Sequence, residues 1–344
     1  MLVNKVFKIP EKALIVLPDF IGDTVLLIPV LRNLRYNFNE NTSIDLIGNK
    51  NVINLLETLP FFDNFYLNKV TNKLSFLKKQ KYDTIFLFNF QLSWTIFSCQ
   101  AKVSQRISFN LERIGFKSLP LWRNLITHFI NSTPINDKKP QKEVYLNVLK
   151  DLNLKIFDEY IDVKLTNKDL DKAKELLENI PKPRISIHVT AGSPGKQWDI
   201  KNWIIILKYL KNKYNGGFIS MGAESEKNIY DYLADQSGIK LNNLCGKTTI
   251  RETLALYQDL DLMITIDTAS AHLAALANTK NIIIIYGPTN ESQWNPYTLS
   301  SNIKQVYLNL PCRPCLTRFC RHKNCLRLLK PSEIINITDK IPMF

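Results

Sequence analysis

Strand-length apolar runs alternate in this sequence with amphipathic segments of helical period, and the alternation occurs twice. Each apolar run is short and almost continuous, as is typical of a parallel strand that is buried on both faces. Parallel strands joined by helices form doubly wound sheets, so the pattern predicts an α/β fold. The apolar runs include 12–17, 43–48, 82–89, 184–189, 216–222, 261–266 and 281–287, and the helical segments include 23–38, 50–59 and 167–180.

Two domains are expected from the length of the chain. A sequence of 344 residues exceeds what one hydrophobic core usually serves, and less regular sequence interrupts the pattern between 90 and 165. We predict Rossmann-like domains over 1–165 and 166–328, with the carboxyl ends of both sets of strands facing a central cleft. Residues 329–344 are expected to form a C-terminal helix, and one placement for that helix is back on the N-terminal domain.

The formal net charge of +14 is spread over both halves of the chain. The lysine-rich stretches 73–81 and 137–142 are interpreted first as solvated faces, with attraction to anionic lipid head groups or a polyanionic substrate as the alternative. A nucleic-acid-binding protein is disfavoured, because the aromatic residues are not interleaved with Lys and Arg as a base-stacking platform requires. An oxidoreductase is disfavoured because the Gly-x-Gly-x-x-Gly dinucleotide fingerprint is missing.

A cytoplasmic protein is expected from the distribution of apolar residues. The apolar stretches are far shorter than the roughly 20 residues of a membrane-spanning helix. Pro10, Glu11 and Lys12 also break the first apolar run, so the N-terminal sequence does not have the pattern of a signal peptide.

Asp23 lies where the first strand gives way to a helix, directly after Gly22. Ligands of doubly wound sheets bind at such junctions, and a carboxylate there could accept a proton. The alternative is an N-cap, which stabilises a helix by about 1 kcal/mol.

A second junction carries hydroxyl groups and a cation. Thr190 and Ser193 supply the hydroxyls, two glycines leave backbone N–H groups accessible, and Lys196 adds a point charge for a phosphate. The glycine spacing does not match a P-loop. A solvated turn is the alternative.

A third junction follows the apolar run 261–266. Asp267 and Thr268 precede a helix that begins with small residues, so an anion could approach the N–H groups of its first turn. His272 lies four residues after Thr268 and therefore on the same helix face. The alternatives are a cap for Asp267 and a buried core residue for His272.

Together these segments resemble glycosyltransferase family 9, the heptosyltransferases of bacterial lipopolysaccharide core assembly. The resemblance extends over nearly the whole chain and depends on the combination of motifs, since each motif alone is common. The motifs are "LIVLPDFIGDTVLLIPVLRNLR", "SQRISF", "GKQW", "GAESE", "LCGKTTIRETLALYQDLDLMITIDTASAH" and "IIYGPT". The family implies a GT-B fold, in which two Rossmann-like domains flank a cleft, an ADP-heptose donor in the C-terminal domain and a lipid-linked acceptor at the N-terminal one.

By matched position, the resemblance assigns a role to each candidate residue. Asp23 takes the place of the catalytic base, and the other positions take the place of donor contacts. Thr190 and Lys196 match phosphate contacts, Glu226 a carboxylate that bonds the ribose, Thr248 the adenine-pocket turn, and Asp267, Thr268 and His272 the Asp-Thr-Gly-x-x-His motif.

Three positions depart from the family pattern and leave the donor sugar open. Ala269 replaces the usual Gly and adds a methyl group near the diphosphate. Ala191 replaces a hydroxyl found in some members, and Gly195 lengthens the following loop.

Four cysteines, Cys312, Cys315, Cys320 and Cys325, fall within 14 residues. Their spacing could hold zinc, with His322 as an alternative ligand. Because some heptosyltransferases carry a similar segment before the final helix, we favour a structural or interface role without metal.

The sequence thus predicts an inverting glycosyltransferase that needs neither metal nor cofactor. Asp23 deprotonates an acceptor hydroxyl, while Lys196 and the helix after Thr268 stabilise the departing diphosphate. The expected partners are an ADP-sugar, an anionic lipid-linked glycan and the inner membrane surface, on which the apolar segment 119–130 is one candidate contact and plain core or surface the other. The alternatives are a transferase for another nucleotide sugar and a non-catalytic anion-binding protein.

Overall fold

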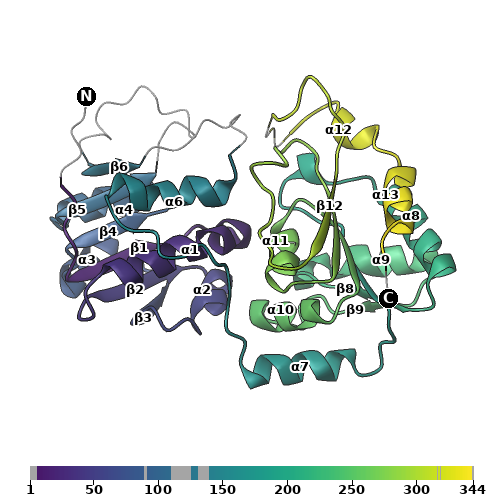
Figure 1. Ribbon diagram of the computed structural model, residues 1–344, viewed down its shortest axis with the longest axis horizontal. Coiled ribbons are helices and arrows are strands. Elements are labelled where there is room, and N and C mark those ends of the chain that lie inside the picture. Colours follow the sequence, from purple (N-terminus) through teal and green to yellow (C-terminus); the bar gives the residue numbers. More distant parts are fainter. Residues whose placement is uncertain are drawn as a thin grey trace. The chain divides into compact units, whose positions relative to one another are not determined.

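The chain folds into two compact units, Met1–Lys164 and Leu165–Phe344, in the computed structural model (Figure 1). The structure describes residues 6–88, 91–109, 125–130, 139–315, 317 and 319–342. Each unit contains a parallel sheet with alternating helices, which confirms the predicted doubly wound α/β class. Of the helices in these described ranges, none is long and apolar enough to cross a membrane.

The first unit is built on a six-stranded sheet in the order β3-β2-β1-β4-β5-β6. The central strands are fully buried, and Val16 of β1 lies opposite Ile47 of β2 and Leu87 of β4. The strands are β1 Lys12–Val16, β2 Ser43–Gly48, β3 Asn64–Leu67, β4 Thr84–Leu87, β5 Gln105–Phe109 and β6 His128–Ile130, and the helices are α1 Ile21–Asn37, α2 Lys50–Leu56, α3 Lys73–Gln80, α4 Leu92–Gln100 and α6 Gln141–Asp151.

The alternation continues where the sequence looked irregular, because β5 and β6 complete the first sheet. β5 begins with a polar residue, Gln105, which is nevertheless buried. Its amide donates to the Lys8 carbonyl at 2.8 Å and to the Thr84 hydroxyl at 2.9 Å. A polar side chain satisfied in this way occupies a core position without an apolar signal, and β6 at the sheet edge has only 3 residues.

The second unit is built on a six-stranded sheet in the order β12-β11-β10-β7-β8-β9. Its strands are β7 Arg184–His188, β8 Gly217–Ser220, β9 Leu241–Asn243, β10 Leu262–Ile266, β11 Asn281–Ile285 and β12 Asn302–Val306. Its α-helices are α7 Asn167–Leu177, α8 Ile200–Lys213, α9 Lys227–Ser237, α10 Ile250–Gln258, α11 Ala269–Leu276, α12 Asn324–Arg327 and α13 Pro331–Asp339, with short 3₁₀ turns η2 Pro194–Lys196 and η3 Glu224–Glu226. The edge strand β9 has only 3 residues, and β12 has three polar residues among its 5, so the apolar pattern of the sequence did not reveal them.

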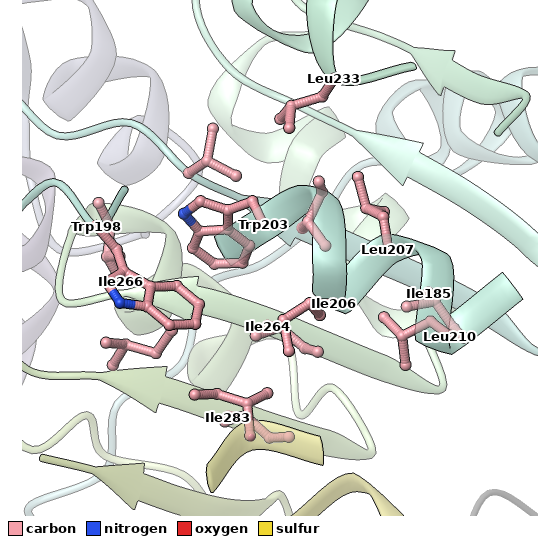
Figure 2. Packing of buried hydrophobic residues seen from close by; sticks show 14 of the residues in the cluster. Ile185, Trp198, Trp203, Ile206, Leu207, Leu210, Leu233, Ile264, Ile266 and Ile283 are labelled. Atoms are coloured by element: carbon pink, nitrogen blue, oxygen red, sulfur yellow. The ribbon is translucent and has the colours of Figure 1, made fainter. Parts of the chain in front are cut away.

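The core of the second unit lies between α8 and the sheet (Figure 2). Trp203, fully buried on α8, packs edge-on against Trp198 with ring centroids 5.5 Å apart. The Trp198 indole N–H donates to the carbonyls of Leu326 and Leu329, at 3.1 and 3.3 Å. These bonds attach the loop before α8, which carries Lys196, to the backbone of α12 and of the residues just after it.

The C-terminal helix α13 belongs to the second unit, where it packs on α8. Ile334 of α13 is fully buried in the core of that unit. Lys213 at the end of α8 donates to the Thr338 carbonyl at 3.3 Å and pairs with Asp339. Residues 329–342 thus contribute to the core of the second unit.

Candidate active site

Asp23 is the third residue of α1 and is half-buried. The N-cap position is held by Phe20, which has no side-chain cap, so the interpretation of Asp23 as the N-cap was wrong. A carboxylate in the first turn is stabilised by the positive end of the helix dipole. Its Oδ1 accepts a 2.7 Å hydrogen bond from the hydroxyl of Tyr145, a buried residue of α6. The position of this carboxylate is therefore fixed by both α1 and α6.

Lys196 and Asp267 form an ion pair that joins the second and third junctions. The Lys196 ammonium lies 2.7 Å from Asp267 Oδ2 and donates to the Asp267 carbonyl at 3.2 Å. Thr289, in the loop after β11, donates to the same carboxylate oxygen at 2.5 Å. The Lys196 side chain is 27% exposed and that of Asp267 only 5%. The interpretation of Lys196 as part of a solvated turn was therefore wrong, since the cation is anchored and half-buried.

The helix α11 begins directly behind this ion pair. Thr268 is its N-cap residue, with extended backbone and no side-chain cap bond. Asp267 precedes the cap and points its carboxylate to Lys196 instead, so it is not the cap that the alternative interpretation assumed. The next residues, Ala269, Ser270 and Ala271, are small, and the start of the helix concentrates partial positive charge. Lysine and helix dipole together favour an anion here.

His272 is buried one turn into α11 and is neutral at pH 7. Burial lowers the pKa of its imidazole to about 4, with Asp267 raising and Lys196 lowering it by smaller amounts. Its Nδ1 is buried and has no hydrogen-bond partner in the described ranges. A core histidine normally has its polar atoms satisfied, so the simple core interpretation does not account for this nitrogen.

Because His272 is buried in its neutral form, we predict that the protein loses stability as the pH falls from 7 to 5. The unfolded imidazole, with a pKa near 6.5, takes up a proton in this window, whereas the folded one, with a pKa of about 4, does not. The unfolded state then binds more protons, so the free energy of unfolding falls as the pH falls, by about 2 kcal/mol for this group. Urea unfolding at each pH measures the slope.

His272→Gln removes the titrating group and should flatten this slope. The control His322→Gln replaces an exposed histidine instead, so both variants lose one imidazole. Equal slopes for wild type and His272→Gln would show that His272 is not buried in the neutral form. His188, whose pKa burial also lowers, contributes in the same direction in all three proteins.

Thr190 and Glu226 flank a second polar cluster, centred on the buried His188. The ring Nδ1 of His188 lies 3.1 Å from the Met221 carbonyl and 3.3 Å from the Tyr230 hydroxyl. A carbonyl only accepts, which favours a proton on Nδ1 and leaves Nε2 to accept from the Thr190 hydroxyl at 3.4 Å. Glu226 acts electrostatically on His188 and accepts at 2.7 Å from the backbone N–H of Ala223.

Thr248 lies in the turn before α10, beside the Glu226 loop. The Gly246 N–H of this turn donates to the Gly222 carbonyl at 2.9 Å, which joins the two loops. The Thr248 hydroxyl bonds that of Thr253 at 2.9 Å. The following residue, Thr249, rather than Thr248, caps α10 through a capping box with Glu252.

These groups gather at the carboxyl ends of adjacent strands. Thr190 follows β7, the Glu226 loop follows β8, Asp267 follows β10 and Thr289 follows β11, and these strands are neighbours in the order β11-β10-β7-β8. The chain leaves β7 toward β8 on one side and returns to β10 on the other. This reversal is the switch point at which doubly wound sheets bind ligands.

Two residues of this site, Thr289 and Arg313, were missed by the sequence reasoning. Thr289 follows a predicted strand in "IIYGPT", so its position at a strand end was the available signal. Arg313 had no local signal, because it acts across the fold. Its buried guanidinium donates to the carbonyls of Gly287, Leu308 and Thr289, at 2.5, 2.9 and 3.0 Å, and pairs with Glu291 at 3.1 Å. Arg313 thus anchors the cysteine segment to the loop that carries Thr289.

The four clustered cysteines are all free thiols. Cys312 and Cys315 are exposed, and Cys325 is a buried residue of α12. Across the described ranges, no group of three or more His, Cys, Asp or Glu side chains is arranged to hold a metal. The Cys315 N–H donates to the Pro288 carbonyl at 2.9 Å. The segment therefore contacts the Thr289 loop through its backbone as well as through Arg313.

A structural role for these cysteines predicts purified, reduced protein without stoichiometric metal. Elemental analysis for zinc and iron should give well under one metal per chain, and a chelator should not change turnover. Metal at one per chain, lost together with thermal stability on chelation, would instead make the cluster a metal site.

The predicted surface segments are only partly visible. Residues 119–124 of the apolar stretch and 137–138 of one lysine-rich stretch lie outside the described residues. In the other stretch, Leu77 of α3 is buried whereas Lys78 and Lys79 are exposed in its last turn. Lysines in the last turn of a helix interact favourably with the negative end of its dipole. This arrangement agrees with the interpretation of 73–81 as a solvated face.

Comparison with known proteins places this chain among glycosyltransferases. The family model "Glycosyltransferase family 9 (heptosyltransferase)" matches residues 74–326. Lipooligosaccharide heptosyltransferase 2 of Campylobacter jejuni is 29% identical over 339 residues, which cover 94% of this chain and 96% of that protein.

Two solved structures share the whole fold at low identity. A family 9 glycosyltransferase from Veillonella parvula has a TM-score of 0.74 at 15% identity and covers 96% of each chain. The Escherichia coli ADP-heptose lipopolysaccharide heptosyltransferase II has a TM-score of 0.73 at 16% identity, covering 96% of this chain and 98% of its own.

Proposed function

The chain belongs to glycosyltransferase family 9, and from this premise we propose that it transfers heptose from ADP-heptose, with inversion, to a lipopolysaccharide core acceptor. Family membership makes it a glycosyltransferase of the GT-B fold that acts in lipopolysaccharide core synthesis. The donor sugar, the stereochemical course and the roles of individual residues are the proposal.

The observation that carries the proposal is the arrangement of Lys196, Asp267 and α11 at the switch point of the second sheet. An ammonium has three N–H donors, and Lys196 uses two of them on Asp267. The carboxylate and Thr289 hold the cation over the start of α11, where the diphosphate of a nucleotide sugar would lie. Thr268 and the first N–H groups of α11 supply further donors, and Thr190 lies on the neighbouring strand.

The nucleoside is assigned to the β8 and β9 side of the same sheet. By the family resemblance, Glu226 binds the ribose hydroxyls and the turn at Thr248 contacts the adenine. The hydrogen bond between Gly246 and Gly222 keeps these two loops together. His272, with its buried Nδ1, is assigned to the sugar and phosphate side.

The transfer step follows from these roles. Asp23 takes the proton of the acceptor hydroxyl, whose oxygen forms a bond to the anomeric carbon from the face opposite the diphosphate. The bond between that carbon and the diphosphate oxygen breaks, and its electron pair leaves with ADP. One displacement inverts the anomeric configuration, and Lys196 and the dipole of α11 stabilise the charge on the leaving group.

The acceptor and location are proposed from the class of the reaction. A lipopolysaccharide core is anionic and lipid-linked, so the net charge of +14 favours the approach of the enzyme to it and to an anionic inner membrane surface. We assign acceptor binding to the N-terminal unit, which carries Asp23.

A donor screen tests the function. Purified protein is incubated with a lipid-linked core acceptor and with ADP-heptose, ADP-glucose, UDP-glucose or GDP-mannose, and nucleotide release is followed. We expect release of ADP from ADP-heptose, dependent on the acceptor. Turnover of a different nucleotide sugar would favour the alternative that Ala269, in place of the family's Gly, shifted the donor specificity. Absence of turnover and of ADP binding would refute the proposal.

A further inference from the structure

We propose that Tyr145 is a positioning residue, which orients the carboxylate of Asp23 for the transfer step without touching the sugar. The inference rests on the proposed function, in which Asp23 is the base. It adds a residue that lies 122 positions away in the sequence and on a different helix.

The contact is short and rigidly supported on the tyrosine side. The Tyr145 hydroxyl donates to Asp23 Oδ1 at 2.7 Å, and Tyr145 is only 4% exposed. Its helix α6 packs along α1, and the neighbouring Val144, Val148 and Leu149 are buried. A ring held in such packing has few rotamers, so its hydroxyl is a fixed reference point for the carboxylate.

The packing of α6 does not require a hydroxyl group on residue 145. Phenylalanine would fill nearly the same volume on this apolar helix face, and a buried hydroxyl costs free energy unless it is hydrogen-bonded. An aspartate side chain has two rotatable bonds, so its contacts decide the orientation of the carboxylate. A charge-assisted hydrogen bond to one oxygen restricts that rotation and fixes the plane in which the base meets the acceptor hydroxyl. Small errors of placement of a base are costly, since misplacement by about 1 Å can slow a reaction 100-fold.

The same unit contains a matched control. The Tyr82 hydroxyl donates to Asp45 Oδ2, also at 2.7 Å, and both residues are buried. Asp45 is the third residue of β2 and Tyr82 lies two residues before β4, whereas Asp23 follows the carboxyl end of β1. Tyr82→Phe therefore removes a buried tyrosine–aspartate bond of equal length without changing the proposed base.

A double-mutant cycle tests the inference. Turnover is measured as ADP release for wild type, Tyr145→Phe, Asp23→Asn and the double variant, and donor affinity by calorimetry. We expect Tyr145→Phe to lower kcat about 10-fold to 100-fold, the range for a hydrogen bond to a charged group, with donor Kd unchanged within twofold. In the Asp23→Asn background the same change should alter kcat less than threefold, because the hydrogen bond to the asparagine no longer orients a base. Tyr82→Phe should lower the melting temperature but leave kcat unchanged.

The outcomes separate this inference from the proposed function. Equal losses from Tyr145→Phe in both backgrounds, or a loss under threefold in the wild-type background, would overturn the positioning role while Asp23 kept its own. If Asp23→Asn alone turned over at the wild-type rate, the base assignment would fail and the inference with it. A wild-type protein that released no ADP would overturn both.

Discussion

Asp23→Asn should fold and bind donor normally but turn over about 10²-fold to 10⁴-fold more slowly, the usual contribution of a general base. Asparagine keeps the size of aspartate and can still accept from the Tyr145 hydroxyl, so the hydrogen bond of 2.7 Å between α1 and α6 has a replacement. What is lost is the site that takes up a proton. The measurement is ADP release at saturating ADP-heptose with a competent acceptor.

The matched control for this variant is Asp19→Asn. Asp19 is an exposed carboxylate in the loop between β1 and α1, four residues before Asp23, and its change should leave turnover close to that of wild type. Near-normal turnover by Asp23→Asn would remove Asp23 from the mechanism. Catalysis would then have to come from positioning and from stabilisation of the leaving group alone.

Lys196→Ala should weaken donor binding by about 1.5 to 3 kcal/mol, roughly 10-fold to 150-fold, as expected for a hydrogen bond to a charged group. The substitution removes the cation that the Asp267 carboxylate holds at 2.7 Å. That carboxylate is almost fully buried, so its negative charge would then also repel the diphosphate. Calorimetry with ADP and with ADP-heptose measures the loss.

Lys201→Ala serves as the control, because Lys201 is an exposed lysine in the first turn of α8. The net charge falls equally in both variants, which separates a local contact from general electrostatic attraction. Equal affinities for wild type and Lys196→Ala, with an unchanged melting temperature, would show that the phosphate lies elsewhere.

The central strands and the strand-end residues were predictable because their signals are local. The run at 261–266 and the small residues after Asp267 define a strand, a junction and a helix start within a few positions. The predicted site residues Lys196 and Asp267 then had to be near each other, since parallel strands present their carboxyl ends at one edge. The ion pair itself, and hence the half-buried state of Lys196, needed the fold.

Contacts between distant segments could not be predicted from the sequence. Tyr145 reads as one apolar position of α6, and nothing near it in the sequence points to Asp23. Arg313 reads as one more basic residue of a basic protein, although its guanidinium is buried against three carbonyl groups. The start of α1 was misjudged for a different reason. An N-cap role was one of the two interpretations of Asp23, whereas the helix begins at Ile21 without a capping side chain.

The indole hydrogen bonds of Trp198 affect the order in which the proposed donor site forms during synthesis. The loop that bears Lys196 is fixed to the carbonyls of Leu326 and Leu329, and the Thr289 loop is fixed by Arg313. Both supports follow β12, the last strand of the second sheet, in the sequence. During synthesis, the strands that carry the phosphate-side residues are complete long before those supports leave the ribosome. A nascent chain can therefore complete these supports of its donor site only after Arg313, Leu326 and Leu329 have been made.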